Sequence, residues 1–242
     1  MPVHFGVRLP QREGGHRLTR ENYVCTTRDG RYYFEDGWLK GEPERWEAHQ
    51  EAVMRNFDRS MAYFASLSPH GFSDAVERMK EAVPELEAVD DLNDWDGVSG
   101  VYVLVLDDFR QLYVGQATAS GGIRQRIVVH WQKKVAFDRL LSGPEERSIM
   151  AIDSFRALDT TRIFAAVCGR PGPLERRVQQ AVAEPFCANR TRAGDLAGGL
   201  AEAIAARRER DLSVFPLSSG GEREAARSCD RDERLALVAV GC

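Results

Sequence analysis

The 242-residue sequence has no long apolar run and few cysteines, and each absence removes a class of protein. No uninterrupted apolar stretch approaches the roughly 18 residues that a membrane span needs, so we expect no membrane partner. The five cysteines are scattered and include no Cys-x-x-Cys pair, which argues against a disulfide framework or a structural zinc site. The start of the chain lacks the basic and apolar regions of a secretory signal. We therefore expect reduced thiols and a cytoplasmic location.

The chain also has little net charge, and the value of −4 does not by itself favour a nucleic-acid partner. The charge is unevenly distributed, however. Residues 1–95 carry 12 Lys/Arg against 18 Asp/Glu, whereas residues 96–195 carry 14 against 11. A basic excess attracts phosphate groups, so an anionic partner is expected to bind the middle of the chain. An excess of three charges is only mild support for this.

The pattern of apolar and turn residues divides the chain into three expected parts. These are an α-rich N-terminal extension carrying a β-hairpin (1–95), a central module (96–195), and a C-terminal helix with a disordered tail beyond Pro216 (196–242). In the first part we expect a hairpin at 22–39, helices at 42–67 and 74–83, and a boundary or linker at 85–96. The first helix is predicted to bury Trp46, Val53, Phe57 and Met61. Ser73 is the expected N-cap of the second helix.

The central module is predicted to be an α/β (α+β) fold with a small three-stranded sheet flanked by helices. The expected elements are strands at 101–106, 111–114 and 161–167, a helix from 123 to about 141, a helix that begins at Pro173 and ends near Asn189, and a further helix at 199–210. Apolar residues and short turn signals predict the strands. Gly143-Pro144 is the first strong breaker after residue 123, and it sets the expected end of the first of these helices.

Several polar residues of the module have side chains suited to cleaving a phosphodiester bond. Glu175 is the only acid between Asp159 and Glu184, and it lies in the first turn of its expected helix. A carboxylate in that place can hold a divalent metal, which acts as a Lewis acid. It can equally well complement the helix dipole, which is the more common role.

Arg126 and His130 are four residues apart, so on a helix both can reach the same phosphate. The planar guanidinium of an arginine can hold two phosphate oxygens. Tyr102 and Tyr113 lie on neighbouring predicted strands, where their hydroxyl groups can orient a water molecule or accept its proton. Each of these residues taken alone is more often a surface or packing residue.

The joint order of these residues is more specific than any one of them. Two strand motifs, Gly-Val-Tyr and Tyr-Val-Gly, are followed by an arginine, a histidine, a glutamate and an asparagine. This arrangement resembles the GIY-YIG nuclease superfamily, with Val in place of Ile in both motifs. The matching residues are Gly100-Val101-Tyr102, Tyr113-Val114-Gly115, Arg126, His130, Glu175 and Asn189. The loop between the second tyrosine and the arginine is longer than usual by about three residues, which a surface loop tolerates.

The resemblance implies an endonuclease that hydrolyses DNA with Mg²⁺ or Mn²⁺. It implies Glu175 as the metal ligand, Arg126 and His130 on the scissile phosphate, and the two tyrosines on the attacking water. Gly115 and Asn189 would give structural support. The alternative is a catalytically silent copy of the fold that binds nucleic acid or protein. The N-terminal extension could also bind a partner and gate the nuclease.

Overall fold

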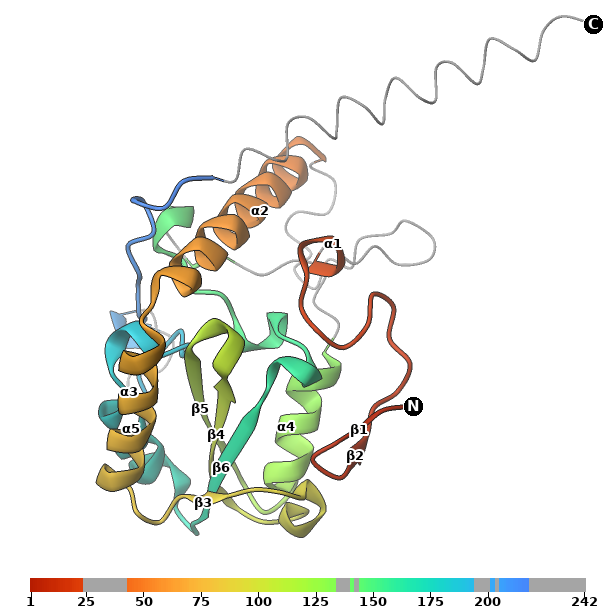
Figure 1. The fold of residues 1–242 in the computed structure, drawn as a ribbon, viewed down its shortest axis with the longest axis vertical. Coiled ribbons are helices and arrows are strands. Elements are labelled where there is room, and N and C mark those ends of the chain that lie inside the picture. The colour runs from red at the N-terminus through yellow and green to blue at the C-terminus, as the bar shows by residue number, and fades with distance from the viewer. Residues whose placement is uncertain (24–42, 134–139, 142–143, 194–200, 203–204, 218–242) are drawn as a thin grey trace, which may run out of the picture.

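The computed structural model describes residues 1–23, 43–133, 140–141, 144–193, 201–202 and 205–217. This part of the chain contains five α-helices and two antiparallel sheets, and it is a mixed α/β fold (Figure 1). The smaller sheet pairs β1 (Val3–His4) with β2 (Val7–Arg8). None of the described helices is both long enough and apolar enough to cross a bilayer.

The larger sheet has the strand order β3-β6-β4-β5. Its strands are β3 (Glu87–Ala88), β4 (Gly100–Leu106), β5 (Gln111–Ala117) and β6 (Arg162–Val167). All seven residues of β4 are buried, as expected for a central strand that is covered on both faces. The turn from β4 to β5 is a single 3₁₀ turn that ends in Arg110, whose backbone is left-handed with φ 52°. β5 is an edge strand of this sheet.

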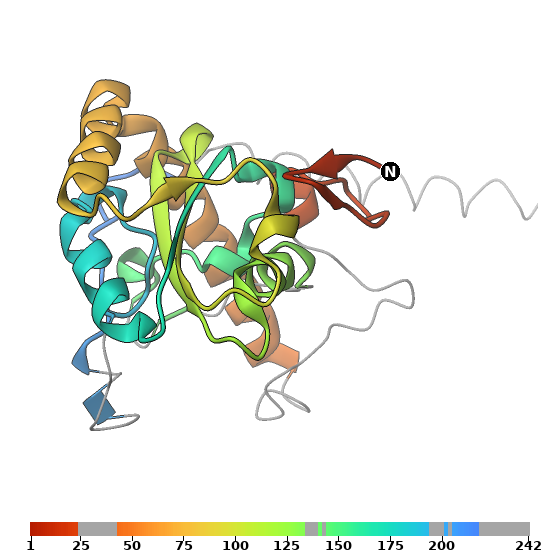
Figure 2. The same ribbon diagram turned by 90° about the horizontal axis from the view of Figure 1, so that it is seen from below.

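Helices cover both faces of the larger sheet (Figure 2). α4 (Gly122–Gln132) and the β1–β2 sheet lie on one side, and α3 (Pro69–Ala82) and α5 (Pro171–Ala181) lie on the other. The alternating side chains of β4 therefore enter two cores. Tyr102, Leu104 and Leu106 enter the core under α4, and the intervening valines enter the core under α3 and α5. The loop that joins β5 to α4 lies at one end of this layered arrangement of helices and sheet.

α2 (Pro43–Ser66) packs beside the sheet and ties the N-terminal part to the central module (Figure 1). Its Val53 and Phe57 are buried in the same core as Tyr102. The buried amide of Asn56 donates to two backbone carbonyl groups, those of Glu145 and Ser148, at 2.7 and 2.9 Å. Both cores contain residues from either side of position 95.

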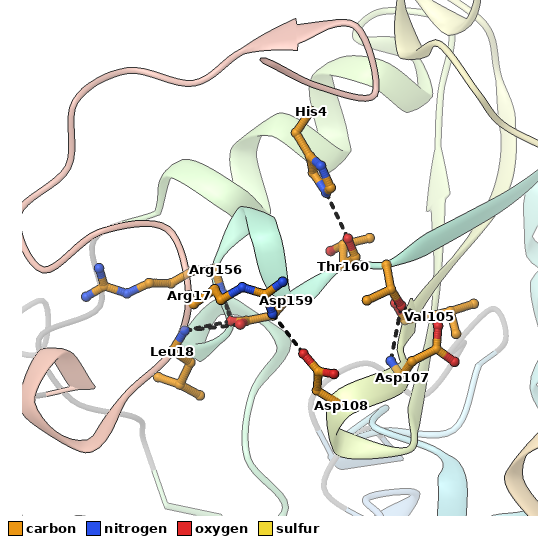
Figure 3. Close-up of polar contacts among 10 residues, drawn as sticks. His4, Arg17, Leu18, Val105, Asp107, Asp108, Arg156, Asp159 and Thr160 are labelled. Carbon is orange, nitrogen blue, oxygen red and sulfur yellow. Dashed lines mark hydrogen bonds and ion pairs between the residues drawn. The ribbon is translucent and has the colours of Figure 1, made fainter. Parts of the chain in front are cut away.

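A buried carboxylate, that of Asp159, holds the segment before α1 (Arg20–Tyr23). The backbone N–H groups of Leu18 and Arg156 donate to it, at 3.1 and 2.7 Å (Figure 3). Burial raises the pKa of Asp159 to about 6, although these donors oppose the rise. Nearby, the imidazole Nε2 of His4 lies 2.8 Å from the carbonyl oxygen of Thr160. Bonds across about 140 residues of sequence thus fix the N-terminal segment to the module.

The guanidinium group of Arg156 completes this attachment. The side chain is 2% exposed and donates to three backbone carbonyl oxygens of the N-terminal segment, those of Glu13, Gly15 and Asn22. These three acceptors carry no net charge. At these positions the buried guanidinium is therefore stabilised by hydrogen bonds and not by an ion pair. We call Arg156 and Asp159 the N-terminal clamp.

The structure confirms the first long helix and corrects the second. The helix predicted at 42–67 is α2, and the prediction that Val53 and Phe57 are buried is confirmed. Met61 is half-buried, and the side chain of Trp46 lies outside the described residues. The second helix, α3, begins at Pro69 rather than at residue 74, because the hydroxyl of Ser68 caps it by accepting from the Gly71 N–H at 3.1 Å. Ser73, the predicted N-cap, lies inside the helix.

Two further predictions for the N-terminal part need correction or lie outside the structure. Residues 85–96, predicted as a boundary or linker, contain β3 and a 3₁₀ turn, and β3 pairs with β6. β3 therefore adds a fourth strand to the sheet that was predicted to have three. Most of the predicted hairpin at 22–39 lies outside the described residues. Its first two residues end helix α1 and are not in a strand.

The central strands are confirmed, but the helices differ in length from the predictions. α4 ends at Gln132 and not near 141. The backbone of Lys133 is no longer helical, although no Gly or Pro marks this position. α5 begins at Pro171 and ends at Ala181, so Asn189 lies well beyond it. In the helix predicted at 199–210, residues 201, 202 and 205 are helical, whereas Arg207 forms a β-bridge with Thr191. The predicted tail lies outside the described residues from position 218 onward.

Candidate active site

The pairing of β4 with β5 places the two motif tyrosines on one face of the sheet. Tyr102 lies directly opposite Gly115, and Tyr113 is two residues earlier on β5. The two rings are 6.4 Å apart between centroids. A Cβ atom on Gly115 would lie 2.4 Å from the ring and hydroxyl of Tyr102, so the ring can occupy this place only over a glycine. Tyr102 is fully buried, whereas Tyr113 is partly exposed.

His130, in the last turn of α4, bonds through both of its ring nitrogens. Its Nε2 atom lies 2.9 Å from the hydroxyl of Tyr102, and its Nδ1 atom lies 2.6 Å from a carboxylate oxygen of Asp153. The other oxygen of Asp153 accepts from the amine of Lys133 at 2.8 Å. The Tyr113 ring meets the imidazole edge to face, with centroids 5.3 Å apart. The imidazole therefore has a fixed orientation.

The charge state of Asp153 follows from these contacts. Burial raises the pKa of the carboxyl group, but the hydrogen bonds from His130 and Lys133 outweigh this and lower the pKa to about 2. Asp153 is therefore an anion at neutral pH, and it acts only as a hydrogen-bond acceptor.

Arg126 lies one helical turn before His130, on the exposed side of α4. Its charge lowers the pKa of both tyrosines. Burial has the larger effect: it raises the pKa of Tyr113 to about 12 and that of Tyr102 well above 10. Both tyrosines are consequently neutral at physiological pH.

Glu175 is half-buried and reaches the same group of residues from α5. Burial raises the pKa of its carboxyl group to about 7, and the charge of Arg126 opposes this rise. The charge of Glu175 also raises the pKa of Tyr102 and Tyr113. α4 and α5 lie on opposite sides of the sheet but both contact β5, the edge strand. The charges of Arg126 and Glu175 therefore act on both tyrosines at one sheet edge, where Tyr102 bonds to His130 and the Tyr113 ring contacts it.

Asn189 lies on the outer side of β5 and pairs with it as a strand would. Its amide oxygen accepts from the Val114 N–H at 2.9 Å, and its amide nitrogen donates to the Val114 carbonyl at 2.7 Å. Just before it, the backbone N–H of Ala188 donates to the carbonyl of Leu112 at 2.8 Å. These three bonds fix the part of β5 that carries Tyr113.

A hollow of about 450 Å³ opens beside these residues, between the end of β5 and the first turns of α4. Arg126 lies at its border and belongs to both the hollow and the site. The lining is otherwise rich in amide, hydroxyl and glycine residues: Gln116, Ala117, Thr118, Ser120, Gly121, Gly122, Gln125 and Val129. The longer loop noted in the sequence forms much of this wall.

Among the predicted site residues, Glu175 supplies the carboxylate, which is a ligand type that Mg²⁺ and Mn²⁺ prefer. No group of three or more His, Cys, Asp or Glu side chains suited to a metal occurs within the described ranges. Mg²⁺ does not need such a cage, because it keeps several of its waters and binds through one or two carboxylates. A half-buried carboxylate whose anionic form is destabilised by burial would gain a countercharge from such an ion.

Sequence reasoning missed two residues of this site, Asp153 and Lys133. Asp153 lies in an irregular stretch between α4 and β6, where no periodic pattern places a side chain. Lys133 directly follows the last residue of α4, inside the region predicted to be helical. Neither has a spacing that would indicate its contact with His130.

Comparison with known proteins finds no family model, no curated protein and no solved structure that matches this chain. Any functional assignment therefore depends on the residues of this site and their geometry.

Proposed function

We propose that this protein is a divalent-metal-dependent endonuclease that hydrolyses phosphodiester bonds in DNA. One observation carries the proposal: at a single edge of the sheet, two tyrosines contact or bond to a histidine, and the charges of an arginine and a half-buried glutamate act on both tyrosines. The order of these residues in a GIY-YIG-like pattern and the basic excess of residues 96–195 support the choice of a nucleic acid as substrate.

The residues divide the work of phosphodiester cleavage between them. Arg126, exposed at the border of the hollow, binds the scissile phosphate and neutralises the charge that grows on it. Tyr113 is more accessible than Tyr102, so it is the tyrosine that contacts the attacking water. A metal ion held by Glu175 would supply Lewis-acid stabilisation of the phosphate.

The raised pKa values define the resting state of this site. With a pKa of about 12, Tyr113 is protonated at neutral pH and orients water by hydrogen bonding. It becomes a proton acceptor only where cations lower its pKa, and the charge of Arg126 acts in that direction. Tyr102, fully buried and bonded to His130, holds the site together from beneath.

Nicking of supercoiled plasmid in Mg²⁺ tests the proposal. Glu175→Gln keeps size and hydrogen bonding but removes the charge, and we expect nicking to fall by orders of magnitude. Arg126→Ala is expected to lower turnover about 10²- to 10³-fold, as the loss of one stabilising donor does elsewhere. The matched control is Glu85→Gln, because Glu85 is an exposed carboxylate whose ion pair is with Arg177 of α5 and not with one of the five proposed site residues. Unchanged nicking by Glu175→Gln would contradict the metal site.

The second candidate is a catalytically silent module that binds nucleic acid or protein. The polar hollow beside Arg126 favours it, because such a surface can hold a ligand without a metal. Gel-shift and nicking assays on the same substrates separate the two functions. A protein that shifts DNA but does not cut it in Mg²⁺ or Mn²⁺ is a binding module. One that cuts, and loses cutting but not binding in Glu175→Gln, is an endonuclease.

A further inference from the structure

A chain of hydrogen bonds runs from Lys133 through Asp153 and His130 to Tyr102, and the proposed mechanism leaves its far end without a role. We propose that Asp153 is a positioning residue that fixes which nitrogen of His130 carries the proton, and thereby orients the hydroxyl of Tyr102 toward its neighbours. The catalytic consequence rests on the proposed nuclease function. The protonation pattern itself does not.

The direction of the bond between His130 and Asp153 follows from the chemistry of the two groups. An ionised carboxylate can only accept, so the Nδ1 atom, 2.6 Å away, must carry a hydrogen and donate it. Lys133 is held at 2.8 Å on the other oxygen and contributes only donors. Asp153 therefore accepts from both sides, and its charge keeps the proton on Nδ1.

The direction of the next bond follows from the first. In a neutral imidazole with its proton on Nδ1, the Nε2 atom has a free lone pair and can only accept. In that neutral form the hydroxyl of Tyr102, 2.9 Å from Nε2, donates to it. Arg126, whose charge acts on the same phenol, can only donate hydrogen bonds. The phenol thus gives its hydrogen to His130, and the lone pairs of its oxygen stay available to a donor.

This ordering links Asp153 to the hydroxyl of Tyr102 through His130. An asparagine at position 153 presents an NH₂ group as well as a carbonyl, so it no longer requires a proton on Nδ1. If the proton moves to Nε2, that nitrogen donates to the Tyr102 oxygen, and the phenol hydrogen must turn away from His130. The expected result is a misoriented Tyr102 hydroxyl in a protein that is otherwise folded.

Nitrogen-15 NMR of histidine-labelled full-length protein reads the protonation pattern without any catalytic assay. The sequence contains five histidines, and His130→Gln identifies the relevant signals by their loss. We expect wild-type His130 to be protonated on Nδ1, Asp153→Asn to shift the proton to Nε2, and Asp153→Glu to retain Nδ1. A wild-type His130 that is protonated on Nε2 at neutral pH, either alone or together with Nδ1, overturns the proposal, and this measurement needs no variant at position 153.

Kinetics then test the link to turnover. Because loss of a residue that orients a histidine commonly costs about 10- to 100-fold, we expect kcat of Asp153→Asn to fall by that factor while KM changes little. The control is Asp108→Asn, which removes an exposed carboxylate paired with Arg17. An Asp153→Asn protein with wild-type tautomer and wild-type kcat overturns the positioning role. A wild-type protein that never cuts DNA overturns the proposed function instead, and the NMR result still decides the role of Asp153.

Discussion

Gly115→Ala is the smallest change that tests the arrangement of the site. The added Cβ atom would lie 2.4 Å from the Tyr102 ring, whereas ordinary contacts begin near 3.4 Å, so the ring must move by about 1 Å. Tyr102 is fully buried and has no empty space to move into without disturbing its neighbours. Overpacking of this kind typically costs about 1–3 kcal/mol.

The displaced ring also loses a polar contact. The hydroxyl of Tyr102 lies 2.9 Å from His130, and a shift of about 1 Å away from it exceeds hydrogen-bonding distance. A buried hydroxyl left without a partner costs about 1–3 kcal/mol more. Replacing glycine by alanine stabilises the folded state by about 0.4–1 kcal/mol, because it lowers the conformational entropy of the unfolded chain. We therefore expect a net loss of about 2 kcal/mol or more in the free energy of unfolding.

Thermal unfolding followed by circular dichroism measures this loss. For a chain of this size, about 2 kcal/mol corresponds to a fall of roughly 4–8 °C in Tm. Gly169→Ala is the matched control, since a Cβ atom there has no heavy atom within 4 Å, and its Tm should not fall. Nicking activity of Gly115→Ala should drop together with Tm. A Gly115→Ala protein with wild-type Tm and wild-type activity would refute the placement of Tyr102 over Gly115.

The remaining predictions concern the buried charges. Because the folded-state pKa of Glu175 is raised from 4.5 to about 7, its carboxyl group stabilises the fold below pH 4.5 and loses that contribution as pH rises through 7. Urea unfolding in EDTA should show this pH dependence in wild type and not in Glu175→Gln, and Mg²⁺ at pH 8 should stabilise only the wild type. Asp159, raised from 3.8 to about 6, should behave in the same way up to pH 6, and unfolding of Asp159→Asn should lack that part of the dependence. Arg156→Lys leaves buried carbonyl groups without donors, so it should lower the free energy of unfolding by about 2 kcal/mol or more and expose residues 1–23 to limited proteolysis. Resistance of that segment in Arg156→Lys would show that the clamp does not hold it.

The strands and the long first helix were predictable from sequence because their signals are local. Apolar runs, a short turn and a helical repeat each depend on neighbouring residues, as in β4 and α2. The start of α3 was predicted five residues too late, with Ser73 as the cap, although a Ser followed by Pro, as at Ser68-Pro69, is a typical cap and first helical residue. The end of α4 was missed because no Gly or Pro marks it.

The residues of the candidate site also differ in whether the sequence could predict them. The motif residues could be identified because their order along the chain is itself a pattern. Asp153 and the N-terminal clamp could not, since their contacts join residues that are 23 and about 140 positions apart. β3 belongs to the same class: two residues become a strand only because β6 offers a partner edge. Such contacts depend on tertiary packing, and the intrinsic strand or helix propensity of a residue does not predict them.

The pairing of Asn189 with Val114 has a consequence for how copies of this protein meet in solution. β5 is the last strand of its sheet, and an uncovered last strand is a template on which another chain can add a strand. The amide of Asn189 and the N–H of Ala188 occupy the outward backbone groups of Leu112 and Val114. One side chain and one peptide unit thus take the place of a neighbouring strand. They prevent another chain from pairing with this stretch of β5. The other end of β5, at Gln116 and Ala117, borders the hollow.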